Sequence, residues 1–379
     1  MIYLDNAATT YPKPESVYEK MDWANRNLAF NAGRGSYSLA KEASRLIDET
    51  RELLLNLVHG NGTEKVVLTT SATEALNIIL QGIPWHEGDV VYVSPFEHNA
   101  VARTLELVKE HKGIRIELLP VIEETLEIDI EKTKYLLLKD KPKCVCCTHV
   151  SNVTGYILPV DKIFDFAHSL GAITVLDSSQ SLGLVDIDVK AINADFIAFA
   201  GHKTLYGPFG VGGFIDINQI NLNLVFAGGT GSDSLNLNMP TKTPDRYEAA
   251  SKNIVAIAGL NAALQSAEVK EAFKHENELL NYMIDGLQKI KGVTIYQEEL
   301  KCDQRTGVLS FNVKGMLAED IGIILSDDFD IAVRVGYHCA PYIHRYLNDE
   351  KHLGTVRVGL SKYNSFDEVE TLLKALKSI

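Results

Sequence analysis

The feature that most constrains this chain is a regular alternation of short β-branched segments and longer amphipathic segments, beginning near residue 63. Lys65 to Thr70 and Ala172 to Asp177 are typical of buried strands, whereas Asn99 to Lys112 has apolar residues at helical spacing. Parallel strands joined through helices need crossover connections. The pattern therefore predicts an α/β fold in which a mostly parallel sheet is sandwiched by helices.

The sequence changes character after Gly228. The segment Ala227 to Asp245 is rich in Gly, Ser, Thr, Asn and Pro, which is typical of a functional or interfacial loop. Helical patterns at 254–289, 317–325 and 366–377 and strand patterns at 293–296, 308–312, 332–335 and 355–360 follow it. We interpret residues 15–250 as a large domain and residues 251–379, together with 1–14, as a smaller α/β domain.

Charge and composition exclude several functional classes. The chain has 37 Lys and Arg against 50 Asp and Glu, a net charge of −13, which argues against a whole-surface grip on nucleic acid or on an anionic membrane. No apolar run reaches the ~18 residues of a transmembrane helix, and the first residues lack the basic region of a secretory signal. Five cysteines fit a reducing compartment. We expect a soluble cytoplasmic protein without a nucleic-acid or membrane partner.

Polar residues follow five of the predicted strands. Ligands of open parallel sheets bind at the carboxyl ends of the strands, so these residues are the first candidates for a site. Ser71 and Glu74 have the spacing of a capping box, which could either only begin a helix or also seat a phosphate. The groups are Ser71-Ala72-Thr73, Glu97-His98-Asn99, Ser151-Asn152, Asp177-Ser178-Ser179-Gln180 and Gly201-His202-Lys203.

Three residues carry possible chemistry, two of them in these strand-end groups. Asp177 ends a buried strand, where a carboxylate needs a cap, an ion pair or a ligand with a protonated ring nitrogen. A lone Lys is usually a solvated surface charge. Lys203 differs because it follows a Gly and a His at the end of the next predicted strand, where ligands bind. Cys339 lies near Arg334 and His338, cations that could stabilise a thiolate.

The other cysteines are interpreted as structural. Cys144 and Cys147 form a C-x-x-C pair, but no second pair exists and the segment has strand character. Core packing is therefore the expected role of both, Cys302 needs no special account, and no metal site is predicted.

The segments LDSSQSLG, FAGHKTLYGPFGVGG and RVGYHCAP together resemble the class V aminotransferase family of pyridoxal-phosphate enzymes, in its cysteine desulfurase and selenocysteine lyase branch. YLDNAATT, TTSATEALN, EHNA, HVSNVTG, PDRYEAAS and TVRVGLSKYN match in the same order, so the resemblance covers almost the whole chain. It implies an aspartate-aminotransferase-like fold.

The resemblance also implies a set of cofactor contacts. Lys203 would form the Schiff base with pyridoxal 5'-phosphate, and Asp177 would pair with its ring nitrogen. His98 would stack on the ring, with Gln180 and Asn152 at its phenolic oxygen. The phosphate would be bound by Ala72, Thr73, His202 and, from the partner subunit of a homodimer, Thr230. Ala200 stands where the family usually has Ser, which removes one phosphate hydrogen bond.

The implied reaction is the conversion of L-cysteine to L-alanine, with Cys339 attacking the substrate sulfur and keeping it as a persulfide for an acceptor protein. Arg357 would clamp the substrate carboxylate, with Arg334 and Asn152 also contacting the substrate. Tyr337 stands where proteins of the resembled desulfurase branch often have His. A selenocysteine lyase, an aminotransferase or lyase for another small amino acid, and a catalytically idle regulator of sulfur transfer stay open as alternatives.

Overall fold

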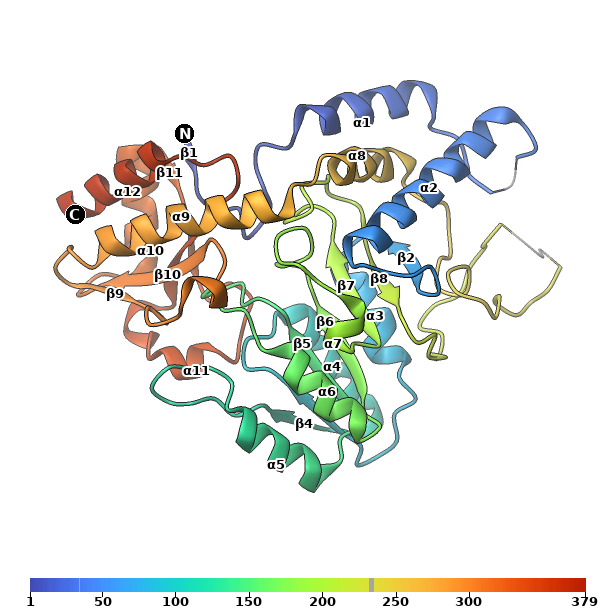
Figure 1. Cartoon of the computed structure of the whole chain (residues 1–379), viewed down its shortest axis with the longest axis horizontal. Coiled ribbons are helices and arrows are strands. Elements are labelled where there is room, and N and C mark those ends of the chain that lie inside the picture. Colours follow the sequence, from blue (N-terminus) through green and yellow to red (C-terminus); the bar gives the residue numbers. More distant parts are fainter. Residues whose placement is uncertain (34, 232–234) are drawn as a thin grey trace.

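A seven-stranded sheet forms the centre of the larger part of the molecule (Figure 1). The computed structural model describes residues 1–33, 35–231 and 235–379. Strands β3 to β7 pair in parallel, whereas β8 is antiparallel to both of its neighbours, β2 and β7. In spatial order the strands are β2 (Lys65–Thr69), β8 (Gly212–Asp216), β7 (Phe196–Ala200), β6 (Ile173–Asp177), β5 (Cys144–Thr148), β3 (Val90–Val93) and β4 (Arg115–Leu118). The predicted mostly parallel sheet is confirmed.

Both faces of this sheet are covered. Along β7, Phe196 and Ala198 pack into one apolar cluster while Ile197 and Phe199 pack into another. Alternate side chains of a strand point to opposite faces, so a strand buried on both sides is apolar throughout. The helices that follow the strands are α3 (Ala72–Gly82), α4 (Asn99–Lys112), α5 (Ile130–Asp140), α6 (Val160–Ser169) and the short α7 (Val189–Ile192).

Three further helices lie together beside the sheet (Figure 1). They are α1 (Glu15–Asn27), α2 (Ser38–Leu57) and α8 (Ile254–Gln265). The helix expected over 254–289 is in fact two helices, because three residues separate the end of α8 at Gln265 from the start of α9 (Val269–Leu287). Residues 232–234 of the predicted loop 227–245 lie outside the described residues, and no described residue of that loop belongs to a helix or strand.

The later part of the chain forms a second, antiparallel sheet. Its order is β12 (Arg334–Gly336), β13 (Thr355–Gly359), β10 (Val308–Val313) and β9 (Val293–Ile295). Its core includes Phe311 and Val356 of the sheet with Leu279, Ile321 and Leu372 of the helices. Those helices are α9, α10 (Ala318–Phe329) and α12 (Phe366–Ser378), and α11 (His344–Leu347) lies between β12 and β13.

The start of the chain joins this later part. Strand β1 (Ile2–Tyr3) pairs in parallel with β11 (Ile331–Ala332), an arrangement that the predicted grouping of 1–14 with 251–379 requires. The division into residues 15–250 and residues 251–379 with 1–14 stays a prediction. No helix within the described ranges combines the length and apolar character that crossing a bilayer needs.

Candidate active site

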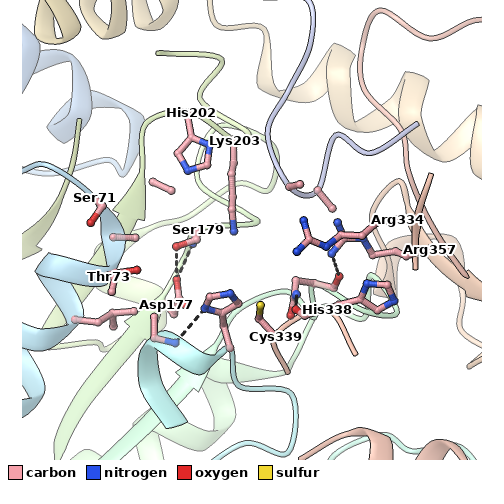
Figure 2. Close-up of a pocket in the computed structure, with 18 residues that line it drawn as sticks. Ser71, Thr73, Asp177, Ser179, His202, Lys203, Arg334, His338, Cys339 and Arg357 are labelled. Carbon is pink, nitrogen blue, oxygen red and sulfur yellow. Dashed lines mark hydrogen bonds between the residues drawn. The ribbon is translucent and has the colours of Figure 1, made fainter. Parts of the chain in front are cut away.

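A cavity of about 230 Å³ lies where the carboxyl ends of β5, β6 and β7 face the smaller sheet (Figure 2). The fold thus brings together residues that are up to 350 positions apart in the sequence, since Ala7 and Arg357 share this lining. Most of the residues singled out from the sequence line it: Ala72, Thr73, His98, Asn152, Asp177, His202, Lys203, Arg334, Cys339 and Arg357.

Two of the predicted site residues do not line this cavity. Gln180 is buried and donates from Nε2 to the backbone oxygen of Ala7, at 2.7 Å. Thr230 lines a different cavity, together with Asn31 and Lys252. The predicted cofactor contacts of Gln180 and Thr230 stay predictions.

Asp177 is the last residue of β6 and is 4% exposed. Its Oδ1 accepts hydrogen bonds from the Ser179 amide (3.0 Å) and the Ser179 hydroxyl (2.5 Å) (Figure 2). Within the described ranges, no residue donates to Oδ2. A buried carboxylate is costly unless its charge is compensated, so this oxygen suits a ligand that brings a proton of its own.

Lys203 lies in the turn after β7 and extends into the middle of the cavity (Figure 2). Burial lowers the pKa of its amine to about 8, with the nearby Asp177 opposing that shift and Arg357 and Arg334 adding to it. A lysine of this kind loses its proton near neutral pH and is then a nucleophile and a base.

Two histidines of the cavity are neutral. Burial and the charge of Lys203 lower the pKa of His98 to about 4. Burial, Lys203 and Lys13 lower the pKa of His202 to about 4. His98 caps α4, and because its Nδ1 accepts from the Ala100 amide (3.0 Å), the ring proton is on Nε2. Nδ1 of His202 is buried without a hydrogen-bond partner.

The amino end of α3 supplies an anion-binding surface on the same side. Ser71 caps the helix by accepting from the Glu74 amide (3.2 Å), and Ala72 and Thr73 form its first turn. The first N–H groups of a helix have no partner within it and carry a partial positive charge. Gly212 of β8 permits the close approach, because a Cβ there would lie 2.8 Å from the Ala72 nitrogen. Ser71 therefore caps the helix, and together with Ala72 and Thr73 it also lines the cavity.

Two arginines form the opposite wall, next to each other on paired strands (Figure 2). Arg357 is 2% exposed; its Nη2 donates to Asp5 Oδ1 (2.6 Å) and its Nη1 to the backbone oxygen of Asn152 (3.0 Å). Its Nε is buried without a partner. Arg334 lies across from it, and no ion pair of Arg334 occurs in the described part of the chain. Like charges opposite each other on neighbouring strands are unfavourable, so this wall favours an anion.

Cys339 follows β12 and points into the cavity from the side opposite Lys203 (Figure 2). The residue is also exposed to solvent. The other candidate thiols differ from it: Cys144 and Cys147 are fully buried in β5, and burial raises the pKa of both thiols. The packing role expected for the C-x-x-C pair agrees with this placement.

Sequence reasoning missed residues of the N-terminal segment. Ala7 and Ala8 line the cavity, and Asp5 pairs with Arg357. The motif YLDNAATT carries part of the resemblance, and Asp5 within it is the sequence feature that could have indicated the contact with Arg357. His338, which the sequence offered as a cation beside Cys339, also lines the cavity, but burial, and after it Arg357, holds its pKa well below the usual range. The ring is therefore neutral, and the cationic role expected of His338 is wrong.

Glu97 directly precedes His98 of the cavity and leads to a prediction about stability. The carboxyl is completely buried; its Oε1 accepts from the Ser94 hydroxyl and from the Thr148 amide (2.6 Å), and its Oε2 has no partner. Burial raises its pKa to about 8 from an ordinary 4.5. The folded protein thus holds this proton more tightly than the unfolded chain, and the resulting stability is lost as the pH rises from 4.5 through 8.

We expect Glu97→Gln to become progressively more stable than the wild type as the pH rises. The two proteins should be similar near pH 5 and differ by about 2 to 5 kcal/mol near pH 9, because the amide never ionises. Urea unfolding at a series of pH values measures this difference. A difference that does not change with pH would contradict a neutral Glu97.

The comparisons with known proteins agree with this geometry. The family model described as aminotransferase class-V matches residues 2–372. A probable cysteine desulfurase of Halalkalibacterium halodurans is 32% identical over 100% of this chain and 92% of its own length. One of Pyrococcus abyssi is 33% identical over 100% of this chain and 94% of its own length.

A solved structure shows the same fold. The apo cysteine desulfurase from Thermococcus onnurineus NA1 superimposes with a TM-score of 0.91 at 30% identity, covering 100% of this chain and 94% of that one. The family match over nearly the whole chain and these full-length relatives lead to one conclusion: the chain belongs to the class V aminotransferase family.

Proposed function

We propose that this protein is a pyridoxal-phosphate-dependent cysteine desulfurase, which converts L-cysteine to L-alanine and keeps the sulfur as a persulfide on Cys339. The observation that carries the proposal is the presence, in one cavity, of a cysteine thiol and a lysine amine whose pKa is lowered to about 8 (Figure 2). The full-length relatives named cysteine desulfurase support it.

The cavity fits pyridoxal phosphate, the cofactor that enzymes of this family use. Asp177 Oδ2 suits a protonated ring nitrogen, and the ring of His98 suits stacking on the cofactor. The unpartnered His202 Nδ1 and the amino end of α3 suit a phosphate. Lys203 would hold the cofactor covalently. When bound, the cofactor supplies an electron sink for the Cα–H bond of an amino acid.

The arginine wall fits the carboxylate of the substrate. Arg357 Nε is buried without a partner, and Arg334 faces the same cavity. Because guanidinium groups bind carboxylates in a planar, bidentate manner, the two side chains would orient L-cysteine with its sulfur toward Cys339. Asp5 and the Asn152 carbonyl keep the Arg357 guanidinium in place.

The protein's own groups divide the reaction between them. Lys203 Nζ, with a pKa of about 8, takes the proton from Cα and later returns a proton to the product. The Cys339 thiolate attacks the substrate sulfur, so that an S–S bond forms and the C–S bond breaks. The electron pair of the C–S bond remains on the substrate carbon, which takes up a proton. The products are alanine and the Cys339 persulfide.

The alternatives differ in their need for this thiol. A selenocysteine lyase would use the same cavity, whereas an aminotransferase or lyase for another amino acid needs Lys203 and Asp177 but no cysteine. A catalytically idle regulator needs none of these side chains in one cavity. The position of Cys339 therefore favours desulfuration.

The test is the reaction itself. Purified protein with pyridoxal phosphate, L-cysteine and dithiothreitol should release alanine and sulfide in equal amounts, and parallel assays with L-selenocysteine rank the two substrates. Formation of a keto acid with no sulfide would instead support an aminotransferase. No turnover of either substrate would support the idle regulator.

We further propose that the protein is a homodimer with shared sites and passes its sulfur to an acceptor protein. Thr230 lines a different cavity from the one lined by Lys203. Such a position is expected of a residue that serves the active site of the partner subunit instead of its own. A cysteine that is exposed as well as directed into the cavity suits transfer to an external acceptor.

Mixed dimers test the shared site. Lys203→Ala and Thr230→Asp subunits should each be inactive alone, the second because its carboxylate repels a phosphate. A mixture refolded together should regain activity, because one site of each mixed dimer then has neither change. Mixtures no more active than their parents, or a fully active monomer, would contradict the shared site.

A further inference from the structure

The loop that carries Cys339 has an unusual backbone. It runs from the end of β12 at Gly336 to α11, and Gly336, His338 and Cys339 have φ values of 98°, 48° and 56°. Left-handed conformations are disfavoured for residues that have a Cβ, and here two such residues are adjacent. The surrounding structure must therefore hold the loop in this shape.

Three successive carbonyl groups of the loop are held by three different segments. The Asn152 amide donates to His338 O (2.8 Å), and the backbone N–H of Asn99 donates to Cys339 O (2.7 Å). Asn152 lines the cavity, and Asn99 lies between its lining residues 98 and 100. The third group, Tyr337 O, accepts from the backbone N–H of Ala340 within the loop (3.0 Å) and also lies 3.0 Å from Nε2 of His344 in α11, a residue that does not line the cavity.

His344 is itself fixed by a buried carboxylate. Its Nδ1 lies 2.5 Å from Oδ2 of Asp349, which is fully buried, and His344 is only 7% exposed. A backbone carbonyl can only accept, so Nε2 of the ring carries a proton and donates it to Tyr337 O. The Tyr337 ring packs edge-on against the same imidazole, with centroids 5.0 Å apart.

We infer that His344, oriented by Asp349, is a positioning residue that keeps the Cys339 thiol directed into the cavity by holding the carbonyl of Tyr337. The inference rests on the proposed function of Cys339. His344 does not itself line the cavity, although its ring lies 6.2 Å from that of His338, which does. Its loss should therefore slow the sulfur transfer to Cys339 and leave cofactor and substrate binding intact.

The test compares variants that can and cannot donate. His344→Phe combined with Asp349→Asn fills the same space and leaves no unpaired charge, but it cannot donate to Tyr337 O. We expect its kcat for alanine formation to fall about 10- to 100-fold, the effect of misplacing a reacting group by about 1 Å, with KM for L-cysteine and the visible cofactor spectrum unchanged. His344→Gln, which can still donate, should recover part of kcat.

The short helical turn Glu350–His352, which follows α11, offers a matched control. His352 is also buried, and its Nδ1 lies 2.7 Å from Met316 O, away from the residues that line the cavity. We expect His352→Ala to leave kcat near that of the wild type even where it lowers the melting temperature.

A second readout does not depend on catalysis. Amide hydrogen exchange at Asn99 should be faster in the His344→Phe/Asp349→Asn variant than in the wild type or in His352→Ala, because the Cys339 carbonyl no longer holds that N–H. If the wild type forms no alanine, the proposed function fails while the exchange at Asn99 still reports on the loop. Unchanged kcat and unchanged exchange in the folded double variant would overturn the inference. So would loss of the cofactor spectrum in parallel with kcat, which would show a general structural defect.

Discussion

Cys339→Ser is expected to abolish alanine formation from L-cysteine while leaving cofactor binding unchanged. A serine hydroxyl is hardly ionised near pH 7 and is a poor nucleophile toward sulfur, so we expect a loss of about 1,000-fold or more. The visible spectrum should still change when L-cysteine is added, because Lys203, Asp177 and Arg357 are intact. Chromatography of the products measures the loss of alanine formation. Visible spectra of the same samples measure whether cofactor and L-cysteine still bind.

Cys302→Ser is the matched control for this variant. Cys302 is likewise exposed, but it contacts Asn281 and does not line the cavity. The control should keep wild-type activity. Full alanine production by Cys339→Ser would return Cys339 to the role of a loop residue and favour a lyase.

Lys203→Arg is expected to have an equally large effect at an earlier stage. Arginine keeps a positive charge opposite Asp177, but it forms no covalent link to an aldehyde and does not release its proton near neutral pH. We expect activity to fall about 1,000-fold or more, as for the loss of a catalytic nucleophile or base.

Borohydride treatment gives the direct readout for Lys203. In the wild type it should fix the cofactor on the peptide containing Lys203, and in Lys203→Arg no peptide should carry it. Lys109→Ala, a change at a surface lysine that pairs with Glu106, should behave as the wild type. A wild-type protein that takes up no pyridoxal phosphate would contradict the assigned role of Lys203.

The part of the site on the large sheet could be predicted because it follows from topology. Asp177 and Lys203 follow neighbouring parallel strands, and the carboxyl ends of such strands meet at one edge. The same reasoning brought His98 and Asn152 into the candidate list. These positions depend on strand order alone and on no particular side-chain packing.

The contacts made by Arg357 could not be predicted in this way. It pairs with Asp5, 352 residues away, through side chains of a short N-terminal segment that has no periodic pattern. The pairing of Tyr337 O with His344 likewise depends on left-handed backbone angles at His338 and Cys339, which no local sequence rule indicates.

Two elements of the fold were also missed for physical reasons. Strand β8 was not predicted because it contains Gly212 and Gly213, and glycine is unfavourable in strands. The structure nevertheless requires glycine at 213, since a Cβ there would lie 2.2 Å from the backbone oxygen of Val67. The break between α8 and α9 at 266–268 contains no Gly or Pro, so helical periodicity continued through it.

The most direct test of the central claim is the mass of the Cys339 peptide after one reaction cycle. Wild-type protein loaded with pyridoxal phosphate and treated with L-cysteine without reductant should gain one sulfur atom per subunit, and peptide mapping should locate it on Cys339. The released alanine should equal the sulfur bound. Alanine formed with no sulfur on Cys339, or sulfur found on Cys302 instead, would contradict the role assigned to Cys339.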